Sequence, residues 1–137
     1  MKAVLDTVVY VRAVLNPNGL WGRVVFHLSD RYDLVLSPPI AAEILDVVTR
    51  PRVRNKIPSI GDQAIQQIIA VTSTAEFVEP TTRLTVCRDP KDDKFFECAV
   101  AAGAKYIVSE DRDVLDVGEY QGIRTVSAAE FIALLVE

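Results

Sequence analysis

The sequence predicts an α/β fold in which a central parallel sheet of about five strands lies between two layers of helices. Short apolar runs, typical of buried strands, alternate along the chain with segments whose apolar residues recur at spacings of three and four, typical of helices that bury one face. Strands and helices that alternate in this way form parallel sheets with right-handed crossovers. The 137 residues, half of them hydrophobic, suit one domain spanning residues 1–137.

Apolar runs, turn residues and helix caps set the expected boundaries of the elements. Proline follows an N-cap residue at Ser37-Pro38 and at Asp89-Pro90, the usual order at the start of a helix. Gly103 is expected to end a helix and Ser127 to begin one. The expected strands are residues 2–6, 32–36, 76–79, 105–109 and 122–126. The expected helices are residues 7–15, 20–30, 38–49, 59–73, 89–102 and 127–135, and residues 50–56 and 81–88 are expected to be loops.

The composition excludes several classes of protein. A chain with 25% charged and 50% hydrophobic residues is typical of a soluble globular protein rather than a disordered one. No apolar stretch is long enough to cross a bilayer, and the N-terminus lacks the basic segment and apolar core of a signal peptide, so we expect a cytoplasmic protein. The net charge of −4 argues against broad electrostatic capture of a polyanion.

The thiols and the imidazole of this chain do not predict a site. Cys87 and Cys98 lack C-x-x-C spacing, and His27 is the single histidine. A zinc site built from thiolates and imidazoles is therefore not expected. A Cys-His nucleophilic pair would need one particular approach of His27, so we interpret both cysteines as small buried thiols.

Acidic residues, in contrast, fall where this architecture brings side chains together. In open α/β sheets ligands bind beyond the carboxyl ends of the strands, and two apolar runs end there in Asp6 and Asp111. Glu43 lies on the apolar stripe of its expected helix, where an isolated charge is costly. Each has a structural alternative, because Asp6 also suits a helix cap and Glu43 also suits a salt bridge to an arginine.

A further pair of acids, Asp92 and Asp93, lies at the start of a helix. Asp89 and Asp92 are explained by an N-cap and a capping box. Asp93 precedes Phe96 and Val100 by three and seven residues and so lies beside the buried face. The helical wheel alone places both Asp92 and Asp93 near the apolar side, and Asp92 remains a candidate for a supporting role.

Converging carboxylates without His or Cys partners form an oxygen-only site, which Mg²⁺ or Mn²⁺ prefers. Without a cation the like charges repel, and one carboxylate tends to bind a proton. A cation in such a site can orient a phosphodiester, stabilise its developing charge and activate water. The sequence therefore predicts Mg²⁺ or Mn²⁺ as the cofactor.

One segment of this acidic chain is strongly basic. Arginine binds phosphate bidentately, which makes this segment the candidate contact to a nucleic-acid backbone. Such runs are usually only solvated surface. The candidate residues are Arg50, Arg52, Arg54 and Lys56.

A series of short motifs follows one another in chain order and covers nearly the whole chain. Together the motifs form a specific set, although no single motif is specific. They are Val4-Leu5-Asp6-Thr7, Leu36-Ser37-Pro38 with Glu43, Arg50-Pro51-Arg52, Asp89-Pro90-Lys91-Asp92-Asp93-Lys94-Phe95 with Ala99, and Tyr106-Ile107-Val108-Ser109-Glu110-Asp111-Arg112-Asp113. The set resembles the PIN-domain family, and more narrowly its bacterial and archaeal toxins of toxin–antitoxin systems, the VapC-like ribonucleases.

The resemblance implies a PIN-like three-layer fold and a Mg²⁺- or Mn²⁺-dependent endoribonuclease that binds one or two ions. The acids that it implies as metal ligands are Asp6, Glu43, Asp93 and Asp111. It selects Asp93 over Asp92 because the family's acid stands three residues before a large apolar residue and six before a small one. The partners that it implies are RNA, a cognate antitoxin protein and a second copy of the chain in a homodimer.

The resemblance also implies roles for neighbouring residues. Thr7 and Ser109 correspond to hydroxyl residues that orient the acids, and Asp113 assists near the metal or caps a helix. One position departs from the family, which usually has Asn where this chain has Val8. Valine cannot donate the hydrogen bond that positions a neighbouring carboxylate, and the loss of such a group typically costs about 10–100-fold in affinity or activity. We therefore expect a slow nuclease, or one that needs more metal.

Two alternatives remain open. The chain is either an active nuclease or a PIN fold that acts mainly by binding a partner protein, with catalysis weakened at Val8. A gene for a small antitoxin beside this one would favour the toxin, and absence of metal binding would favour the binding module. A phosphotransfer receiver-like domain is a weaker third reading, because its lysine is expected at a strand end and Lys105 begins its strand.

Overall fold

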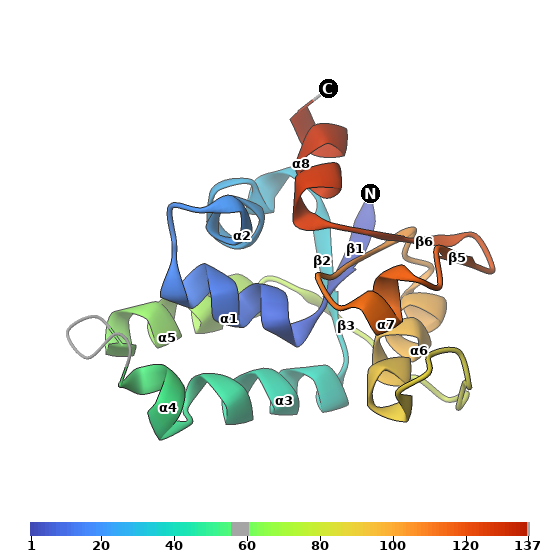
Figure 1. Cartoon of the computed structure of the whole chain (residues 1–137), viewed down its shortest axis with the longest axis horizontal. Coiled ribbons are helices and arrows are strands. Elements are labelled where there is room, and N and C mark those ends of the chain that lie inside the picture. Colours follow the sequence, from blue (N-terminus) through green and yellow to red (C-terminus); the bar gives the residue numbers. More distant parts are fainter. Residues whose placement is uncertain (56–60, 137) are drawn as a thin grey trace.

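The fold is a six-stranded sheet flanked by helices, with strand order β3-β2-β1-β4-β6-β5 (Figure 1). The computed structural model describes residues 1–55 and 61–136. The strands are β1 (Lys2–Leu5), β2 (Asp33–Leu36), β3 (Glu76–Phe77), β4 (Tyr106–Val108), β5 (Glu119–Tyr120) and β6 (Ile123–Val126). The helices are α1 (Thr7–Leu15), α2 (Leu20–Gly22), α3 (Pro38–Val48), α4 (Pro51–Arg54), α5 (Gly61–Thr72), α6 (Asp93–Ala102), α7 (Arg112–Leu115) and α8 (Ala128–Val136).

The first strand lies at the centre of the sheet. β1 pairs in parallel with β2 on one side and with β4 on the other, and β4 pairs in parallel with β6. The carboxyl ends of these strands therefore lie along one edge of the sheet. Ala3, Val4 and Leu5 are fully buried, as expected for a strand covered on both faces.

The expected α/β class is confirmed, with one difference in the sheet. The sequence predicted about five parallel strands, whereas β5 is a sixth strand and runs antiparallel to β6. The two strands are joined by a tight turn in which Gln121 has φ 50° and Gly122 has φ 83°. A two-residue strand before such a turn has too short a pattern to be recognised from the sequence.

Residues 20–30 do not form the single helix that their periodicity predicted. They divide into α2, a π-helical turn η1 (Arg23–His27) and a 3₁₀ turn η2 (Ser29–Arg31). At Gly22 the backbone approaches Pro17 so closely that an added Cβ would lie 1.8 Å from the Pro17 carbonyl oxygen. In η1 the Leu28 N–H bonds to the Arg23 carbonyl five residues earlier.

The basic segment was expected to be a loop, and this expectation is wrong for residues 51–54. Pro51 stands at the first position of α4, where its missing N–H costs nothing, and Asn55 N–H bonds to its carbonyl. Val53 is 8% exposed, so the short helix packs an apolar side chain inward. The proline in this segment predicted a loop, but here it begins a helix.

The remaining boundaries agree with expectation to within a few residues. The helix expected at residues 89–102 begins with a 3₁₀ turn, η3 (Pro90–Asp92), before α6, and Gly103 ends it with φ 69°. The helix expected at residues 59–73 begins at Gly61 as α5, and Ser59 lies outside the described residues. The helix α7 was not anticipated.

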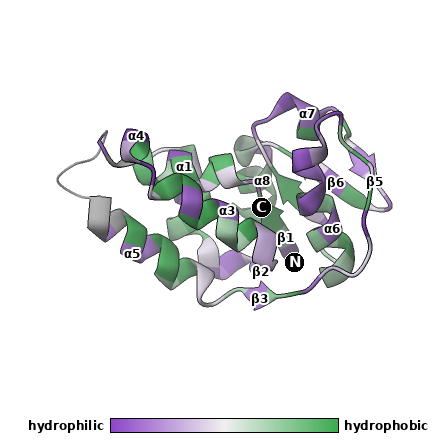
Figure 2. Ribbon diagram, turned by 90° about the horizontal axis from the view of Figure 1, so that it is seen from below, coloured by the Kyte–Doolittle hydropathy of each residue, from purple (hydrophilic) through white to green (hydrophobic). Residues whose placement is uncertain are grey.

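Helices cover both sides of the sheet. Figure 1 shows α6 (gold) on one side of β1 and β2, with α1, α2 and α8 on the other. Phe95, Phe96 and Phe131 are among the largest fully buried side chains of the core. Figure 2 shows that the region around α7, beyond the carboxyl ends of β1 and β4, is largely hydrophilic. Within the described residues, no helix has the length and apolar character needed to cross a bilayer.

Candidate metal centre

Asp6 directly follows β1 and caps the next helix, which is the structural alternative considered for it. Its Oδ1 accepts the Val8 N–H at 3.2 Å, so it caps α1, and its Oδ2 accepts the Ser109 hydroxyl at 2.6 Å. The residue is 3% exposed. Burial raises the pKa of this carboxyl, and hydrogen bonds from Ser109 and Val8 oppose the rise. The charges of Asp111 and Glu43 also raise it.

Ser109 joins the ends of two neighbouring strands. It follows β4, is fully buried, and donates from Oγ to Asp6 while accepting the Asp111 N–H at 3.0 Å. Asp111 in turn caps α7 through its Oδ1, which accepts the Asp113 N–H at 2.9 Å. The orienting contact implied for Ser109 is therefore present, and it fixes the backbone of Asp111 relative to the Asp6 carboxylate.

Asp92 is the last residue of η3 and is half-buried. Its Oδ2 is buried and has no hydrogen-bond partner among the described residues. Burial is the main cause of a rise in the pKa of Asp92 to about 7. The charges that add to the rise belong to Asp111, Asp6 and Asp89, and the positive charge of Lys94 opposes it.

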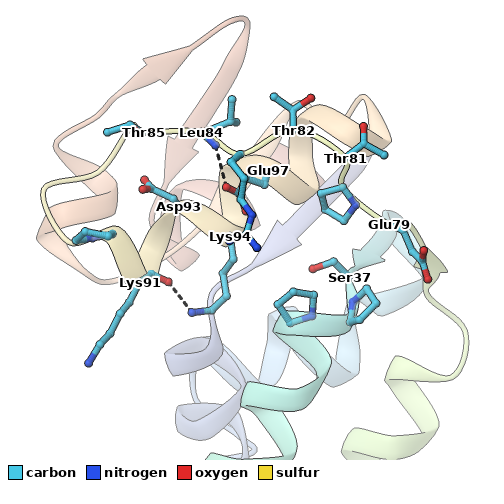
Figure 3. Close-up of a pocket in the computed structure, with 15 residues that line it drawn as sticks. Ser37, Glu79, Thr81, Thr82, Leu84, Thr85, Lys91, Asp93, Lys94 and Glu97 are labelled. Carbon is cyan, nitrogen blue, oxygen red and sulfur yellow. Dashed lines mark hydrogen bonds between the residues drawn. The ribbon is translucent and has the colours of Figure 1, made fainter.

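Asp93, which sequence reasoning preferred over Asp92, is engaged elsewhere. Its Oδ1 accepts the backbone N–H groups of Val86 at 3.0 Å and Cys87 at 2.8 Å. Glu97, one turn later, accepts the Leu84 N–H at 2.9 Å. Asp93 and Glu97 therefore hold the irregular segment before η3 against α6, as Figure 3 shows for Leu84 and Glu97. The Asp92 carboxyl, in contrast, is the one whose pKa the charges of Asp111 and Asp6 help to raise.

Glu43 is half-buried on α3 and forms the ion pair that was its structural alternative. The partner is a lysine rather than an arginine: Lys94 Nζ lies 2.5 Å from Glu43 Oε2. The Glu43 charge still acts on Asp6. We call Asp6, Glu43, Asp92 and Asp111 the carboxylate cluster.

A second grouping of acids borders this cluster. Carboxylate oxygens of Asp89, Asp92 and Asp113 all lie within 4.8 Å of one another. Asp113 also pairs with Arg88, whose Nε lies 3.1 Å away and whose Nη2 lies 2.5 Å from Asp116. Asp89 was read only as a cap, which it is, since it accepts the Lys91 N–H at 3.0 Å. The spacing of Asp89 and Asp92 in the sequence indicates that their carboxylates can lie close together. Nothing in the sequence indicates that Arg88 pairs with Asp113 and Asp116.

The hydroxyl of Thr7 makes no contact of the kind implied for it. Thr7 is the first residue of α1 and is 4% exposed, yet its Oγ1 has no hydrogen-bond partner among the described residues. Val8 follows it with 38% of its surface exposed. A longer polar side chain at position 8 would therefore not have to enter the core.

The basic segment lies away from the carboxylate cluster. Figures 1 and 2 both show α4 at one end of the molecule and α6 with α7 at the other. Arg50 pairs with Asp46 at 2.6 Å, and Arg52 is exposed. Arg54 belongs to α4, and Lys56 lies outside the described residues.

A cleft of about 640 Å³ adjoins the cluster between the start of α3, the start of α6 and residues 79–85 (Figure 3). We call it the α3–α6 cleft. Lys91, Lys94 and Arg83 line it, together with Ser37, whose buried hydroxyl has no hydrogen-bond partner among the described residues. Cations and an unsatisfied hydroxyl are groups that can contact an anion.

The donor set of the cluster fits a hard divalent cation. The ligands on offer are all carboxylate oxygens, which suits Mg²⁺ or Mn²⁺, and the buried Asp92 Oδ2 is left without a partner. The two thiols do not compete, because burial raises the pKa of both Cys87 and Cys98 to about 12 and neither forms a disulfide. Both cysteines are buried, as predicted.

Comparison with known proteins gives consistent results. The sequence pattern of a family described as PIN domain matches residues 2–113. The uncharacterised protein MJ1680 of Methanocaldococcus jannaschii is 29% identical over 118 residues, which are 85% of this chain and 75% of that protein.

Two solved structures share the fold at low identity. VapBC2 from Rickettsia felis, bound to a DNA fragment from its promoter, matches with a TM-score of 0.60 and 14% identity over 93% of this chain and 98% of that one. PAE2754 from Pyrobaculum aerophilum matches with a TM-score of 0.63 and 13% identity over 98% of this chain and 89% of that one.

Proposed function

The chain belongs to the PIN-domain family, and on this basis we propose that it is a divalent-metal-dependent endoribonuclease, the toxin of a toxin–antitoxin pair. PIN domains are generally nucleases, and the structural similarity to a VapBC complex supports the toxin assignment. The site supports the chemistry independently of the family.

The observation that carries the proposal is the carboxylate cluster at the ends of β1 and β4. The charge of Asp111 helps to raise the pKa of Asp6, and the charges of Asp111 and Asp6 help to raise the pKa of Asp92, whose buried Oδ2 has no partner among the described residues. Buried like charges are costly, and a structural role explains only some of their oxygens. A bound cation would relieve this repulsion.

Each residue of the cluster has a distinct part in holding the ion and the substrate. Asp6 and Asp111 are held rigidly through Ser109, so their oxygens stay in place when the ion binds. Asp92 supplies the unsatisfied oxygen, and Glu43 closes the cluster from α3. When bound, Mg²⁺ or Mn²⁺ supplies positive charge that activates water and stabilises the charge developing on the phosphodiester.

The same proposal includes the partners and the basic segment. Leu45, Ile69 and Phe77 are about half exposed beside an apolar cavity of about 260 Å³ between α3, α5 and β3. Exposed apolar surface of this kind supports a homodimer, and sedimentation velocity of the purified chain would measure its mass directly. A cognate antitoxin is proposed from the toxin assignment, and Arg50, Arg52, Arg54 and Lys56 are proposed to contact RNA beyond the site.

The alternative function is a PIN-fold binding module with weakened catalysis. Val8 in place of the usual Asn favours it, because no donor at this exposed position can orient a carboxylate. Such a module would act through its partner protein and would bind metal weakly or not at all.

Cleavage of a fluorescent single-stranded RNA, with Mn²⁺, with Mg²⁺ and with EDTA, tests the proposal. The Asp6→Asn variant, purified in parallel, controls for contaminating ribonuclease. We expect cutting that needs the metal and disappears in Asp6→Asn. Cutting by the folded wild type no faster than by Asp6→Asn would favour the binding module instead.

A further inference from the structure

Lys94 places a positive charge at the edge of the carboxylate cluster. Its Nζ lies 2.5 Å from Glu43 Oε2 and donates to the Lys91 carbonyl at 2.5 Å. The side chain of Lys94 is 18% exposed, and that of Glu43 is 34% exposed. The contact joins α6 to α3 and is held by a second hydrogen bond, unlike a mobile pair on the open surface.

The same lysine also lines the α3–α6 cleft, where Lys91 and Arg83 lie among the carboxylates of Glu79, Asp93 and Glu97. On the cleft side, Asp93 and Glu97 already accept backbone N–H groups, whereas Lys91 and Arg83 add positive charge. Ser37, at the start of α3, lies behind the wall of this cleft with its hydroxyl fully buried (Figure 3). An anion entering the cleft would meet the cations of Lys91, Arg83 and Lys94.

We propose that Lys94 is a built-in counter-cation that neutralises Glu43 until a divalent ion binds, and then exchanges Glu43 for a phosphate group of the substrate in the α3–α6 cleft. The inference rests on the proposed function, because it takes Glu43 as a metal ligand and a phosphodiester as the substrate. It adds a residue that is neither a metal ligand nor part of the basic segment.

The physical reason is competition for one carboxylate. A divalent ion attracts Glu43 more strongly than an ammonium does at the same distance, because the Coulomb energy scales with charge. Once the ion takes Glu43, the partly buried ammonium of Lys94 loses its partner, which is unfavourable unless another anion replaces it. The lysine stem is flexible enough to turn toward the cleft, where the phosphate of a bound strand supplies that anion.

Metal binding without RNA tests the first half of the exchange. Titration calorimetry with Mn²⁺ would compare the wild type with Lys94→Gln, with Lys94→Arg and with Lys91→Gln, the last being a control for an exposed cation in the turn η3 just before α6. Removing the competitor should tighten Mn²⁺ binding by about two- to fivefold in Lys94→Gln, the range for a partly exposed ion pair. Lys94→Arg and Lys91→Gln should change it less. Unchanged or weaker binding in a folded Lys94→Gln would overturn the proposal.

RNA cleavage at saturating Mn²⁺ tests the second half. Lys94→Gln should lower kcat by about tenfold to a hundredfold despite its tighter metal binding, and Lys94→Arg should restore part of the rate. A wild-type kcat in Lys94→Gln would contradict the phosphate contact. If the wild type itself bound no Mn²⁺, the proposed function would fall, and the exchange with it. If the wild type binds Mn²⁺ but Lys94→Gln binds it no more tightly, the exchange is overturned and the proposed function still stands.

Discussion

Two adjacent aspartates make different contacts because they meet different surroundings. Asp92 carries a buried oxygen without a partner among the described residues, and the charges of Asp111 and Asp6 help to raise its pKa, whereas Asp93 accepts two backbone N–H groups from residues 86 and 87. In the sequence both lie near the apolar side of one helix. The contacts that distinguish Asp93 from Asp92 come from residues 86 and 87, which lie in a segment with no periodic pattern. The sequence alone could therefore not predict these contacts.

We expect Asp92→Ala and Asp93→Ala to have opposite effects on stability and on Mn²⁺ binding. Asp92→Ala removes a buried like charge, so in EDTA its Tm should stay the same or rise by a few degrees, while Mn²⁺ binding is lost. Asp93→Ala leaves two backbone donors unsatisfied and should lower the free energy of unfolding by about 2 kcal/mol. Thermal melting in EDTA and Mn²⁺ calorimetry measure both. Loss of metal binding in a folded Asp93→Ala, with binding kept in Asp92→Ala, would restore the original assignment.

Val8 is a second residue at which a single side chain should change activity. The Val8→Asn substitution adds a donor at an exposed position beside Asp6, and should raise RNA cleavage or lower the metal concentration that is needed, by up to about tenfold. Initial rates across a Mn²⁺ series would show the change, with Val8→Thr as a smaller polar control. An equal or lower rate in Val8→Asn would mean that this position does not limit catalysis.

At the level of elements, most of the chain could be predicted and the exceptions have local causes. The strand ends that carry Asp6 and Ser109 follow from apolar runs in a βα order. The exceptions depend on close backbone approaches or on turns that leave no periodic pattern in the sequence. They are the breaks in residues 20–31, the start of α4 at Pro51 and the short strand β5. The pairing of Glu43 with Lys94 brings together two distant helices, and no local pattern contains it.

The helix α8 begins with a reciprocal capping box. Ser127 Oγ accepts the Glu130 N–H at 3.2 Å, and Glu130 Oε1 accepts the Ser127 N–H at 3.0 Å. The hydrogen bond from the Ser127 N–H to the carboxylate, and a smaller contribution from the Ser127 side chain, lower the pKa of the exposed Glu130. Because the folded-state pKa is the lower one, the stabilisation is present above the unfolded-state value and is lost as the pH falls through the folded-state value.

Glu130→Ala should therefore destabilise the protein at pH 7 by about 0.5 kcal/mol, since solvent screens an exposed group, and the difference should shrink toward pH 3. Glu130→Gln keeps an acceptor and should show a smaller, pH-independent change. Urea unfolding at several pH values provides the comparison. A constant Glu130→Ala penalty from pH 7 to pH 3 would show that the carboxylate charge does not contribute.

The helix α4 lies at the opposite end of α3 from the start of α6, and α3 spans roughly 16 Å at 1.5 Å per residue. Charge reversal at Arg52 and Arg54 should therefore weaken binding of long RNA, mainly at low salt, and leave very short RNA unaffected. Fluorescence anisotropy with two RNA lengths at two salt concentrations measures this. Equal binding of the variant and the wild type under all four conditions would remove α4 from the RNA surface.

For the whole molecule, the net charge of −4 and the carboxylate cluster together predict that a divalent ion stabilises the fold. An ion present at 100 times its Kd adds about 2.7 kcal/mol, which corresponds to a rise in Tm of roughly 10 °C. Melting in Mn²⁺ and in EDTA measures the rise, and Asp92→Ala should show little of it. A wild-type Tm that is the same in 10 mM Mn²⁺ and in EDTA would argue against a metal centre at this edge of the sheet.

The two outer strands of the sheet have a consequence for how the protein behaves at high concentration. β3 and β5 are each two residues long, and β5 turns back on β6 in the antiparallel sense. An unpaired strand edge can template further strands from other molecules, and short edges offer few free hydrogen-bonding groups for this. The six strands should therefore resist growth into extended intermolecular sheets, so that crowding or overexpression is expected to yield discrete particles rather than fibrils.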